Sequence, residues 1–310
     1  MKKDFLSILD LSAAELRRIV EEALRLKRAH RAGRRNQRLA GKTLGLLFLK
    51  PSTRTRISFQ AGMTQLGGSS VALNPGEIQL HRGETLEDTA RVVSRFLDGI
   101  VIRTFAHAEI EAWAAAASIP VINGLSDFSH PCQILADLLT IREVRGSLQR
   151  LRVAYIGDGN NVAHSWILAA GMLGIDFVLA APAGYDPDPG VLAAAANLWK
   201  GRGEPPRVVR DPAEAAAGAH FLYTDVWTSM GQEAETKRRL KAFRGYQIDA
   251  KLLARARRGA GVLHCLPAHR GEEIAAEVID GPQSLVFDQA ENRLHAQKAL
   301  LVRLLGRARS

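Results

Sequence analysis

The chain has 310 residues, and its 42 Lys and Arg against 32 Asp and Glu give a formal net charge of +10 at pH 7. With 46% hydrophobic and 24% charged residues, its composition excludes a disordered or collagen-like protein, and its length predicts two domains. The two cysteines, Cys132 and Cys265, cannot build a disulfide framework. Asp4 and Asp10 interrupt the apolar residues near the start, and no window holds the roughly 18 apolar residues of a membrane span. We therefore expect a cytoplasmic protein without a signal peptide or membrane contact.

The surplus positive charge is concentrated in two stretches. Residues 17–38 hold nine Arg or Lys and two Glu, and residues 237–258 hold nine Arg or Lys and one Asp. We predict that both are solvated surface helices, the first with a capping box formed by Ser12 and Glu15. A nucleic-acid-binding surface is the alternative, but no zinc-finger spacing or aromatic-rich RNA-binding motif accompanies the charge. We therefore expect no nucleic-acid partner.

Short apolar segments alternate with amphipathic ones, which predicts an α/β fold with two doubly wound parallel-sheet domains. The predicted strands are residues 44–49, 69–73, 99–102, 121–123, 151–156, 177–180, 221–223, 262–264 and 284–287. The predicted helices include residues 54–65, 86–96, 109–117, 133–143, 163–172 and 291–305. A charged, glycine-containing link near residue 146 divides the chain into predicted domains 1–146 and 147–290. Ligands of such sheets bind outside the carboxyl ends of the strands, so a site is expected at the strand-to-helix junctions.

The junction after the first strand reads KPSTRTR over residues 50–56. It places three hydroxyls and two guanidiniums at a predicted helix start, where unpaired N–H groups and the helix dipole favour an anion. An ordinary N-cap is the alternative, but a cap needs only one hydroxyl. A Walker loop is excluded because residue 36, where its first glycine would lie, is Asn. The junction therefore predicts a phosphate site.

Two further junctions of the first half carry single polar side chains. Arg103 follows the predicted strand 99–102, and His130 precedes Pro131, a residue suited to the first helical position. A histidine there can donate a hydrogen bond to a carbonyl oxygen, although a structural histidine is the alternative. Zinc binding by His130 and Cys132 is disfavoured because no second ligand pair follows at a suitable spacing.

The junctions of the second half offer groups suited to an amine. Residues 157–162 resemble a dinucleotide-binding motif, but Val162 takes its third small position, so a dehydrogenase is a weak alternative. The amides of residues 160–161 could instead bind an amino acid, and the carboxylate of Asp225 suits an ammonium group. Cys265 follows a strand, where it is either a small hydrophobic residue or part of the site. Together the two halves suggest transfer from a phosphorylated donor to an amine in a cleft between the domains.

Five motifs, taken in chain order, resemble ornithine carbamoyltransferases. They are STRTR at residues 52–56, HPCQ at 130–133, DGNN at 158–161, DVWTSMG at 225–231 and HCLP at 264–267. The resemblance implies that the first domain binds carbamoyl phosphate, that the second binds L-ornithine, and that a C-terminal helix, residues 291–310, packs back on the first domain. It also implies that the products are L-citrulline and phosphate in arginine biosynthesis, that no metal or organic cofactor takes part, and that the assembly is a homotrimer or a multiple of trimers.

The resemblance also implies roles for individual residues. Carbamoyl phosphate would be bound by Ser52, Thr53, Arg54, Thr55, Gln79, Arg103, His130, Gln133, Cys265, Leu266 and Arg293. Ornithine would be bound by Asn161, Asp225, Ser229 and Met230. Arg103, His130 and Thr55 would stabilise the oxyanion of a tetrahedral intermediate. Asp225 and Cys265 would orient the attacking amine, without a covalent enzyme intermediate.

Overall fold

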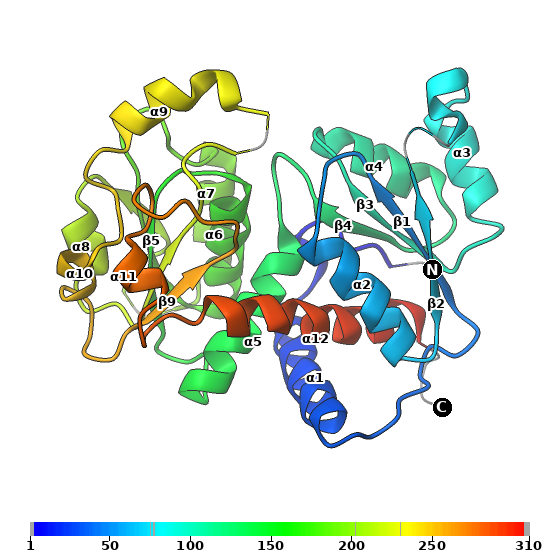
Figure 1. Ribbon diagram of the computed structural model, residues 1–310, viewed down its shortest axis with the longest axis horizontal. Coiled ribbons are helices and arrows are strands. Elements are labelled where there is room, and N and C mark those ends of the chain that lie inside the picture. The colour runs from blue at the N-terminus through cyan, green and yellow to red at the C-terminus, as the bar shows by residue number, and fades with distance from the viewer. Residues whose placement is uncertain (1–2, 75, 77, 202, 230, 307–310) are drawn as a thin grey trace. The chain divides into compact units, whose positions relative to one another are not determined.

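The computed structural model describes residues 3–306 except 75, 77, 202 and 230, and the chain forms two compact units (Figure 1). The first unit comprises Met1–Leu139 and Glu291–Ser310, and the second comprises Thr140–Ala290. The chain passes from one unit to the other within helices α5 (Pro131–Arg145) and α12 (Val286–Leu305). Each unit has its own parallel sheet with helices, which confirms the predicted fold class.

The first unit is built on a four-stranded parallel sheet of order β2-β1-β3-β4. Its strands are β1 (Thr43–Phe48), β2 (Ser69–Leu73), β3 (Gly99–Arg103) and β4 (Val121–Leu125). Its other helices are η1 (Ile8–Asp10), α1 (Ala13–Arg31), α2 (Arg54–Gln65), η2 (Gln79–Arg82), α3 (Leu86–Val93) and α4 (His107–Ala116). In Figure 1, α2 lies in front of this sheet and α4 behind it. The α4 residues Ile110 and Trp113 share an apolar core with Ile100 and Ile102 of β3.

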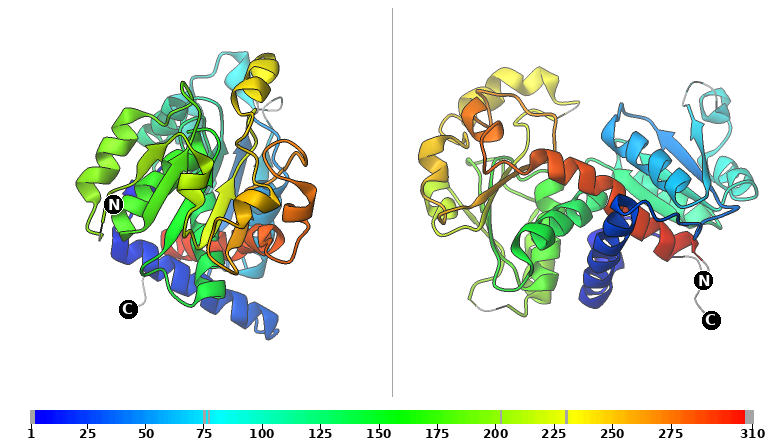
Figure 2. Two further views of the ribbon diagram at one scale, coloured as in Figure 1. Left: turned by 90° about the vertical axis from the view of Figure 1, so that its left-hand side faces the viewer. Right: turned by 60° about the horizontal axis from the view of Figure 1, so that its bottom comes forward.

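The second unit is built on a five-stranded parallel sheet of order β7-β6-β5-β8-β9 (Figure 2). Its strands are β5 (Arg152–Ile156), β6 (Asp176–Ala180), β7 (Arg207–Val209), β8 (Phe221–Thr224) and β9 (Gly261–His264). Its other helices are α6 (Asn161–Leu173), α7 (Pro189–Leu198), α8 (Pro212–Ala216), η3 (Glu233–Glu235), α9 (Thr236–Ala242), α10 (Ala250–Leu253) and α11 (Ala276–Ile279).

Helix α6 is the central helix of the second unit, because nearly all of its residues are buried. Its Trp166 stacks on Phe177 of β6 at a centroid distance of 5.9 Å. Gly171 lets α7 approach closely, since a Cβ at this position would lie 2.6 Å from the carbonyl oxygen of Ala195. The N-terminus of α6 is therefore rigidly placed beside the carboxyl end of β5.

One predicted strand is wrong, and one observed strand was not predicted. In the range 284–287, only Ser284 makes an isolated bridge, to Val262, and α12 begins at Val286. A short apolar run fits a strand or the first turn of a buried helix equally well, and here the helix forms. The unpredicted strand is β7, which has three residues and lies at the sheet edge.

The two basic stretches are not simple surface helices. The predicted capping box of the first is confirmed, since Ser12 Oγ accepts from Glu15 N at 3.2 Å and Glu15 accepts from Ser12 N at 2.9 Å. However, Lys27 is only 2% exposed, and its buried ammonium group donates to Asn292 at 2.7 Å. The second stretch is divided between α9 and α10, and its Arg239 is buried. No helix among the described residues has the length and apolar character to cross a membrane.

Candidate functional site

The STRTR segment lies directly after β1 and forms the start of α2. Thr53 is the N-cap residue, yet its side chain makes no capping hydrogen bond and is exposed. Ser52 and Arg54 are half-buried beside it. The hydroxyls and guanidiniums thus gather at a helix N-terminus without serving as its cap, as the phosphate hypothesis requires.

Three buried polar residues from distant segments meet in the first unit. Arg293 of α12 donates to the side-chain oxygen of Gln133 at the start of α5. Its other terminal nitrogen donates to Thr55 Oγ1 at 2.9 Å, across 238 residues of sequence. Each of the three side chains belongs to a residue that is at most 2% exposed. The structure therefore brings together Thr55, Gln133 and Arg293, to which the family resemblance assigns one substrate.

His130 and Arg103 are also buried in the first unit, at the carboxyl ends of β4 and β3. Burial, followed by the positive charges of Arg293, Arg103 and Arg54, lowers the pKa of His130 well below its usual range. His130 is therefore neutral at pH 7 and can act as a hydrogen-bond donor without carrying charge. The same arginine charges mark an electropositive cluster around it, which favours an anionic ligand.

Three of the residues predicted for the same ligand are not part of this cluster in the described structure: Cys265 and Leu266 belong to the second unit, and Gln79 belongs to the first. Gln79 is exposed at the start of η2, and its side chain makes no hydrogen bond to any residue that the structure describes.

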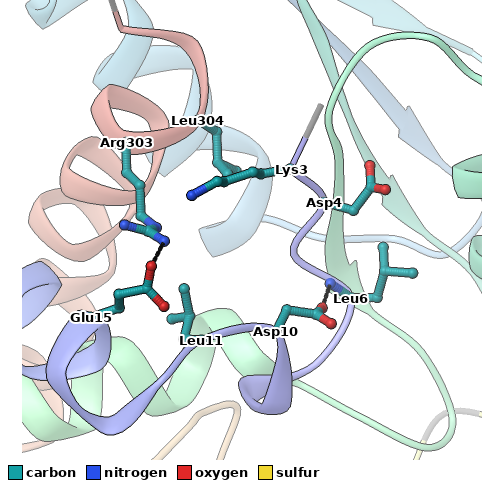
Figure 3. Close-up of a pocket in the computed structure, with 8 residues that line it drawn as sticks. All are labelled: Lys3, Asp4, Leu6, Asp10, Leu11, Glu15, Arg303 and Leu304. Atoms are coloured by element: carbon teal, nitrogen blue, oxygen red, sulfur yellow. Dashed lines mark hydrogen bonds and ion pairs between the residues drawn. The ribbon is translucent and has the colours of Figure 1, made fainter. Parts of the chain in front are cut away.

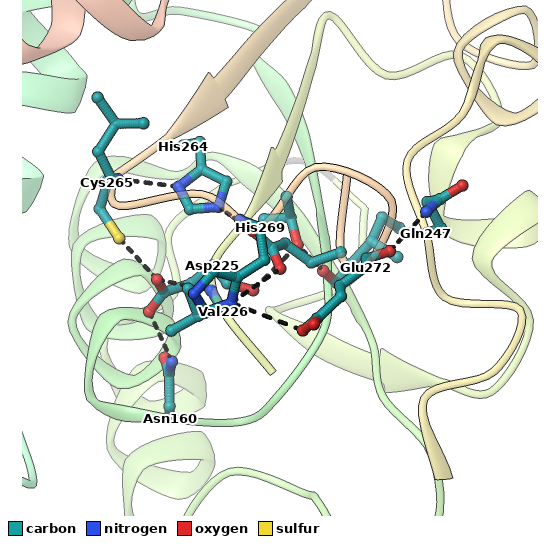
Figure 4. Close-up of polar contacts among 12 residues, drawn as sticks. Asn160, Asp225, Val226, Gln247, His264, Cys265, His269 and Glu272 are labelled. Carbon is teal, nitrogen blue, oxygen red and sulfur yellow. Dashed lines mark hydrogen bonds and ion pairs between the residues drawn. The ribbon is translucent and has the colours of Figure 1, made fainter. Parts of the chain in front are cut away.

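The second unit places a carboxylate between an amide and a thiol (Figure 4). Asp225, which follows β8 and is 8% exposed, accepts from Asn160 Nδ2 at 2.8 Å and from Cys265 Sγ at 2.8 Å. It also accepts from the backbone N–H of Val226 at 2.8 Å. The strands β5, β8 and β9 are neighbours in the sheet, so their carboxyl ends bring these side chains to one edge. Asp225 and Cys265 are thus in contact, and Asn161 is half-buried at the start of α6.

The sequence predicted Asn160 only as one of two adjacent amides that could bind an amino acid, and its observed role is different. Its side-chain oxygen caps α6 by accepting from Val162 N and Ala163 N, at 3.0 and 3.1 Å. The cap aims the amide nitrogen at Asp225. The available signal was an Asn three residues before the predicted helix 163–172, because Asn is a preferred N-cap residue. Nearby, a Cβ at Gly159 would lie 2.2 Å from Pro187 N, so this glycine serves close chain packing.

A buried ion pair lies beside the backbone of Trp227, two residues before Ser229. Arg239 Nη1 donates to Asp158 at 2.6 Å and to the carbonyl oxygen of Trp227 at 3.0 Å. Burial raises the pKa of Asp158, and the charge of Arg239 opposes that rise. Arg239 thereby connects the DGNN and DVWTSMG motifs. The prediction that residues 237–258 form a solvated surface helix did not include this buried contact. Ser229 is half-buried, and Met230 lies outside the described residues.

Asp225, His264 and Cys265 offer three donor atoms within 4.8 Å of one another, which is the spacing of a metal site. His264, however, uses both ring nitrogens in hydrogen bonds, accepting from Leu266 N at 2.9 Å and contacting Glu273 at 3.0 Å. A metal at this trio would have to break one of these bonds, so the donor set does not fit a resident metal without rearrangement.

A separate cavity of about 450 Å³ lies in the first unit, away from the predicted site residues (Figure 3). It is lined by Lys3, Asp4, Leu6, Asp10, Leu11, Glu15, Arg303 and Leu304. Its acidic groups serve the local fold: Asp10 accepts from Leu6 N at 2.6 Å, and Glu15 pairs with Arg303.

Comparison with known proteins gives matches over nearly the whole chain. Residues 3–143 match the family model "Aspartate/ornithine carbamoyltransferase, carbamoyl-P binding domain", and residues 149–304 match "Aspartate/ornithine carbamoyltransferase, Asp/Orn binding domain". A curated relative from Syntrophus aciditrophicus, named ornithine carbamoyltransferase, is 56% identical over 97% of this chain and 99% of its own length. A relative of the same name from Methanoculleus marisnigri is 54% identical over 98% and 97%. The solved structure of ornithine carbamoyltransferase from Pyrococcus furiosus is 49% identical, with a TM-score of 0.95 over 99% of this chain and 98% of that one.

Proposed function

Because the chain belongs to the aspartate/ornithine carbamoyltransferase family, we propose that it transfers the carbamoyl group of carbamoyl phosphate to the δ-amine of L-ornithine. The products are L-citrulline and phosphate. The observation that carries the choice of acceptor is the near full-length identity, above 50%, to relatives named ornithine carbamoyltransferase. The two polar clusters agree with it, because one suits a phosphorylated anion and the other an amine.

Carbamoyl phosphate is proposed to bind in the first unit. Ser52, Thr53 and Arg54 hold its phosphate at the N-terminus of α2, where the helix dipole and N–H groups favour the charge. Thr55 Oγ1 already accepts from Arg293, so its own hydroxyl proton is available to donate to the ligand. Gln133 completes this proposed set, with Gln79 reaching the ligand from η2.

The carbonyl oxygen is proposed to be bound by Arg103, His130 and Thr55. When the amine attacks the carbonyl carbon, negative charge develops on this oxygen, and donors already in place stabilise it. One such donor contributes about 3–4 kcal/mol to the transition state. A neutral His130 supplies an N–H at neutral pH, in agreement with its lowered pKa. The bond between the carbonyl carbon and the phosphate oxygen then breaks, and the phosphate departs beside Arg54 with the proton that the attacking nitrogen loses.

Ornithine is proposed to bind in the second unit. Asp225, Asn161, Ser229 and Met230 hold its polar groups, and Cys265 and Leu266 contact both substrates. The δ-amine has an unperturbed pKa of about 10 and must lose a proton before it attacks. Orientation of the neutral amine by Asp225 and Cys265 then supplies several kcal/mol through reduced entropy. No bond to the enzyme forms, so the thiol orients and does not act as a nucleophile.

The biological setting is proposed from the family resemblance. We place the enzyme in the cytoplasm, in arginine biosynthesis, as a homotrimer or a multiple of trimers that uses no metal or organic cofactor. The domains proposed are 1–146 with the C-terminal helix 291–310 for carbamoyl phosphate, and 147–290 for ornithine. The family models, which match 3–143 and 149–304, support this assignment of the two substrates up to residue 290. The placement of the C-terminal helix is supported instead by its grouping with the first unit.

A panel of acceptors tests the proposed reaction. Purified protein is incubated with carbamoyl phosphate and with ornithine, N-acetylornithine, putrescine or aspartate, and each carbamoylated product is quantified against an enzyme-free control. Ornithine should be preferred by orders of magnitude in kcat/KM. Preference for any other acceptor would overturn the assignment of the substrate while leaving the reaction class intact.

A further inference from the structure

A buried histidine–glutamate pair lies in the loop that carries Cys265 and Leu266. His264 ends β9, Glu273 follows nine residues later, and both side chains are 0% exposed (Figure 4 labels His264). Nothing in the proposed reaction uses Glu273. A fully buried carboxylate is costly unless hydrogen bonds compensate it, so its partners indicate its role.

The hydrogen bonds of His264 define which ring nitrogen carries the proton. The backbone N–H of Leu266 donates to Nδ1 at 2.9 Å, so Nδ1 is an acceptor. A neutral ring then has its proton on Nε2, and this N–H donates to Glu273 Oε1 at 3.0 Å. The backbone N–H of His264 donates to Gln289 Oε1 at 2.9 Å. His264 is therefore held from three directions, and both ring nitrogens are occupied.

Glu273 holds the loop at more than one point. Its Oε1 also accepts from the backbone N–H of His269 at 2.6 Å, and its carbonyl oxygen accepts from Ile248 N at 2.9 Å. Leu266 needs such support, because its φ of 57° lies in the left-handed region, which is unfavourable for a residue with a Cβ. The bond from Leu266 N to the ring stabilises this conformation, and Glu273 fixes the ring.

We propose that Glu273 is a positioning residue that acts through His264 to hold Leu266 and Cys265 where the substrates meet them. This inference rests on the proposed function for its kinetic consequence, but its geometric consequence concerns the loop alone. The pair resembles the orienting half of a triad, in which a carboxylate fixes a histidine. Here the second ring nitrogen accepts from the main chain, so His264 shapes the loop and does not serve as a general base.

Three substitutions separate the possible roles of the carboxylate. Glu273→Leu removes both hydrogen bonds to Oε1, whereas Glu273→Gln keeps an oxygen that can accept them. Glu272→Leu is the matched control, because it removes the neighbouring half-buried carboxylate and no bond to His264. A loop displaced by about 1 Å can lower activity by about 100-fold. We therefore expect Glu273→Leu to lower kcat/KM for ornithine by about 10- to 100-fold, with Glu273→Gln and Glu272→Leu within about threefold of the parent.

Action through His264 is tested by non-additivity. His264→Asn places an amide oxygen near the position of Nδ1, so it can keep the bond to Leu266 while losing contact with Glu273. In that background, Glu273→Leu should lower kcat/KM by less than about threefold, because the route from Glu273 through the His264 ring to Leu266 is already cut, although the bond to His269 N remains. Additive losses would show that Glu273 acts by another route and would overturn the proposal.

The alkylation rate of Cys265 reports on the loop without any substrate. Cys265 is half-buried and donates to Asp225, whereas Cys132 is fully buried and burial raises the pKa of its thiol to about 12. Iodoacetamide should therefore label Cys265 selectively, and faster in Glu273→Leu than in Glu272→Leu. If Glu273→Leu does not fold, His264→Gln replaces it, since that variant loses the bond to Leu266 and should react faster than His264→Asn.

The alkylation rate of Cys265 and kcat/KM for ornithine together distinguish a failure of the positioning role from a failure of the proposed function. If the parent protein forms no citrulline, the proposed function fails, while faster labelling of the loop variants still supports positioning. Unchanged labelling together with unchanged kcat/KM in a folded Glu273→Leu protein would overturn the positioning role and leave the proposed function standing.

Discussion

Replacement of Asp225 by Asn probes the carboxylate at the centre of the proposed ornithine site. The parent side chain accepts three hydrogen bonds of 2.8 Å, from Asn160, Cys265 and Val226 N. Asparagine has nearly the same shape, but it has one oxygen where the carboxylate has two, and its NH2 group would face a donor. The substitution also removes the negative charge that is proposed to pair with an ammonium group of the substrate.

The size of the effect follows from these contacts. A hydrogen bond to a charged group contributes about 1.5–3 kcal/mol, and a lost charge–charge contact in a partly buried site adds to it. We take about 2–3 kcal/mol as the loss in transition-state binding, which corresponds to about a 30- to 150-fold decrease in kcat/KM for ornithine. Carbamoyl phosphate should bind as before, because its proposed contacts with Thr55 and Arg54 are untouched.

Steady-state kinetics with ornithine varied at saturating carbamoyl phosphate measure this loss. Asp280→Asn is the matched control, because Asp280 pairs with Arg270 at the surface and the chemical change is the same. The control should behave as the parent protein does. A folded Asp225→Asn protein with kcat/KM for ornithine within about threefold of the parent would refute the role given to this carboxylate.

Three further changes test separate parts of the structure. Arg54→Ala should weaken carbamoyl phosphate binding by at least about tenfold, because it removes a charged contact at the start of α2. Calorimetry measures this Kd, and an unchanged value would contradict the phosphate site. Arg239→Met should lower the free energy of unfolding of the second unit by about 3–5 kcal/mol, since it leaves Asp158 buried and unpaired. Urea unfolding measures this loss, and a loss below about 1 kcal/mol would contradict the stabilising role of the ion pair. Hydrogen bonds from Ser12 N and Arg303 lower the pKa of Glu15 to about 2. Stabilisation by Glu15 is therefore complete above an unfolded pKa of about 4.3 and is lost as the pH falls toward 2. Glu15→Gln should accordingly lower Tm at pH 7 but hardly at pH 2, and an equal deficit at both would disprove this origin.

The strand-to-helix junctions were predictable because they combine two local signals. A buried strand such as β1 is a short apolar run, and the polar residues that follow it stand out against that run. The motif at residues 52–56 could therefore be assigned to an anion before any contact was known. The first turn of α12 was not predictable in the same way. Its apolar start at Val286 is too short to show the periodicity that distinguishes a helix from a strand.

Local sequence patterns did not predict the contacts between residues that are far apart in the chain. Arg293 meets Thr55 across 238 residues, and only the family resemblance suggested that it belongs to the site. Arg239 is one of nine basic residues in its stretch, and nothing local indicates that it pairs with Asp158, 81 residues away. The net charge of +10 was a poor guide to the ligand or partner for the same reason. Its value counts buried and exposed arginines alike.

The most direct test of the central claim follows the carbamoyl carbon itself. Carbamoyl phosphate labelled with 13C is mixed with ornithine and the purified protein, and NMR records the label while released phosphate is quantified. We expect the label to appear in the ureido carbon of citrulline, with one phosphate released per citrulline and none of this transfer without the protein. Phosphate release without labelled citrulline, or label on another acceptor in preference to ornithine, would contradict the account.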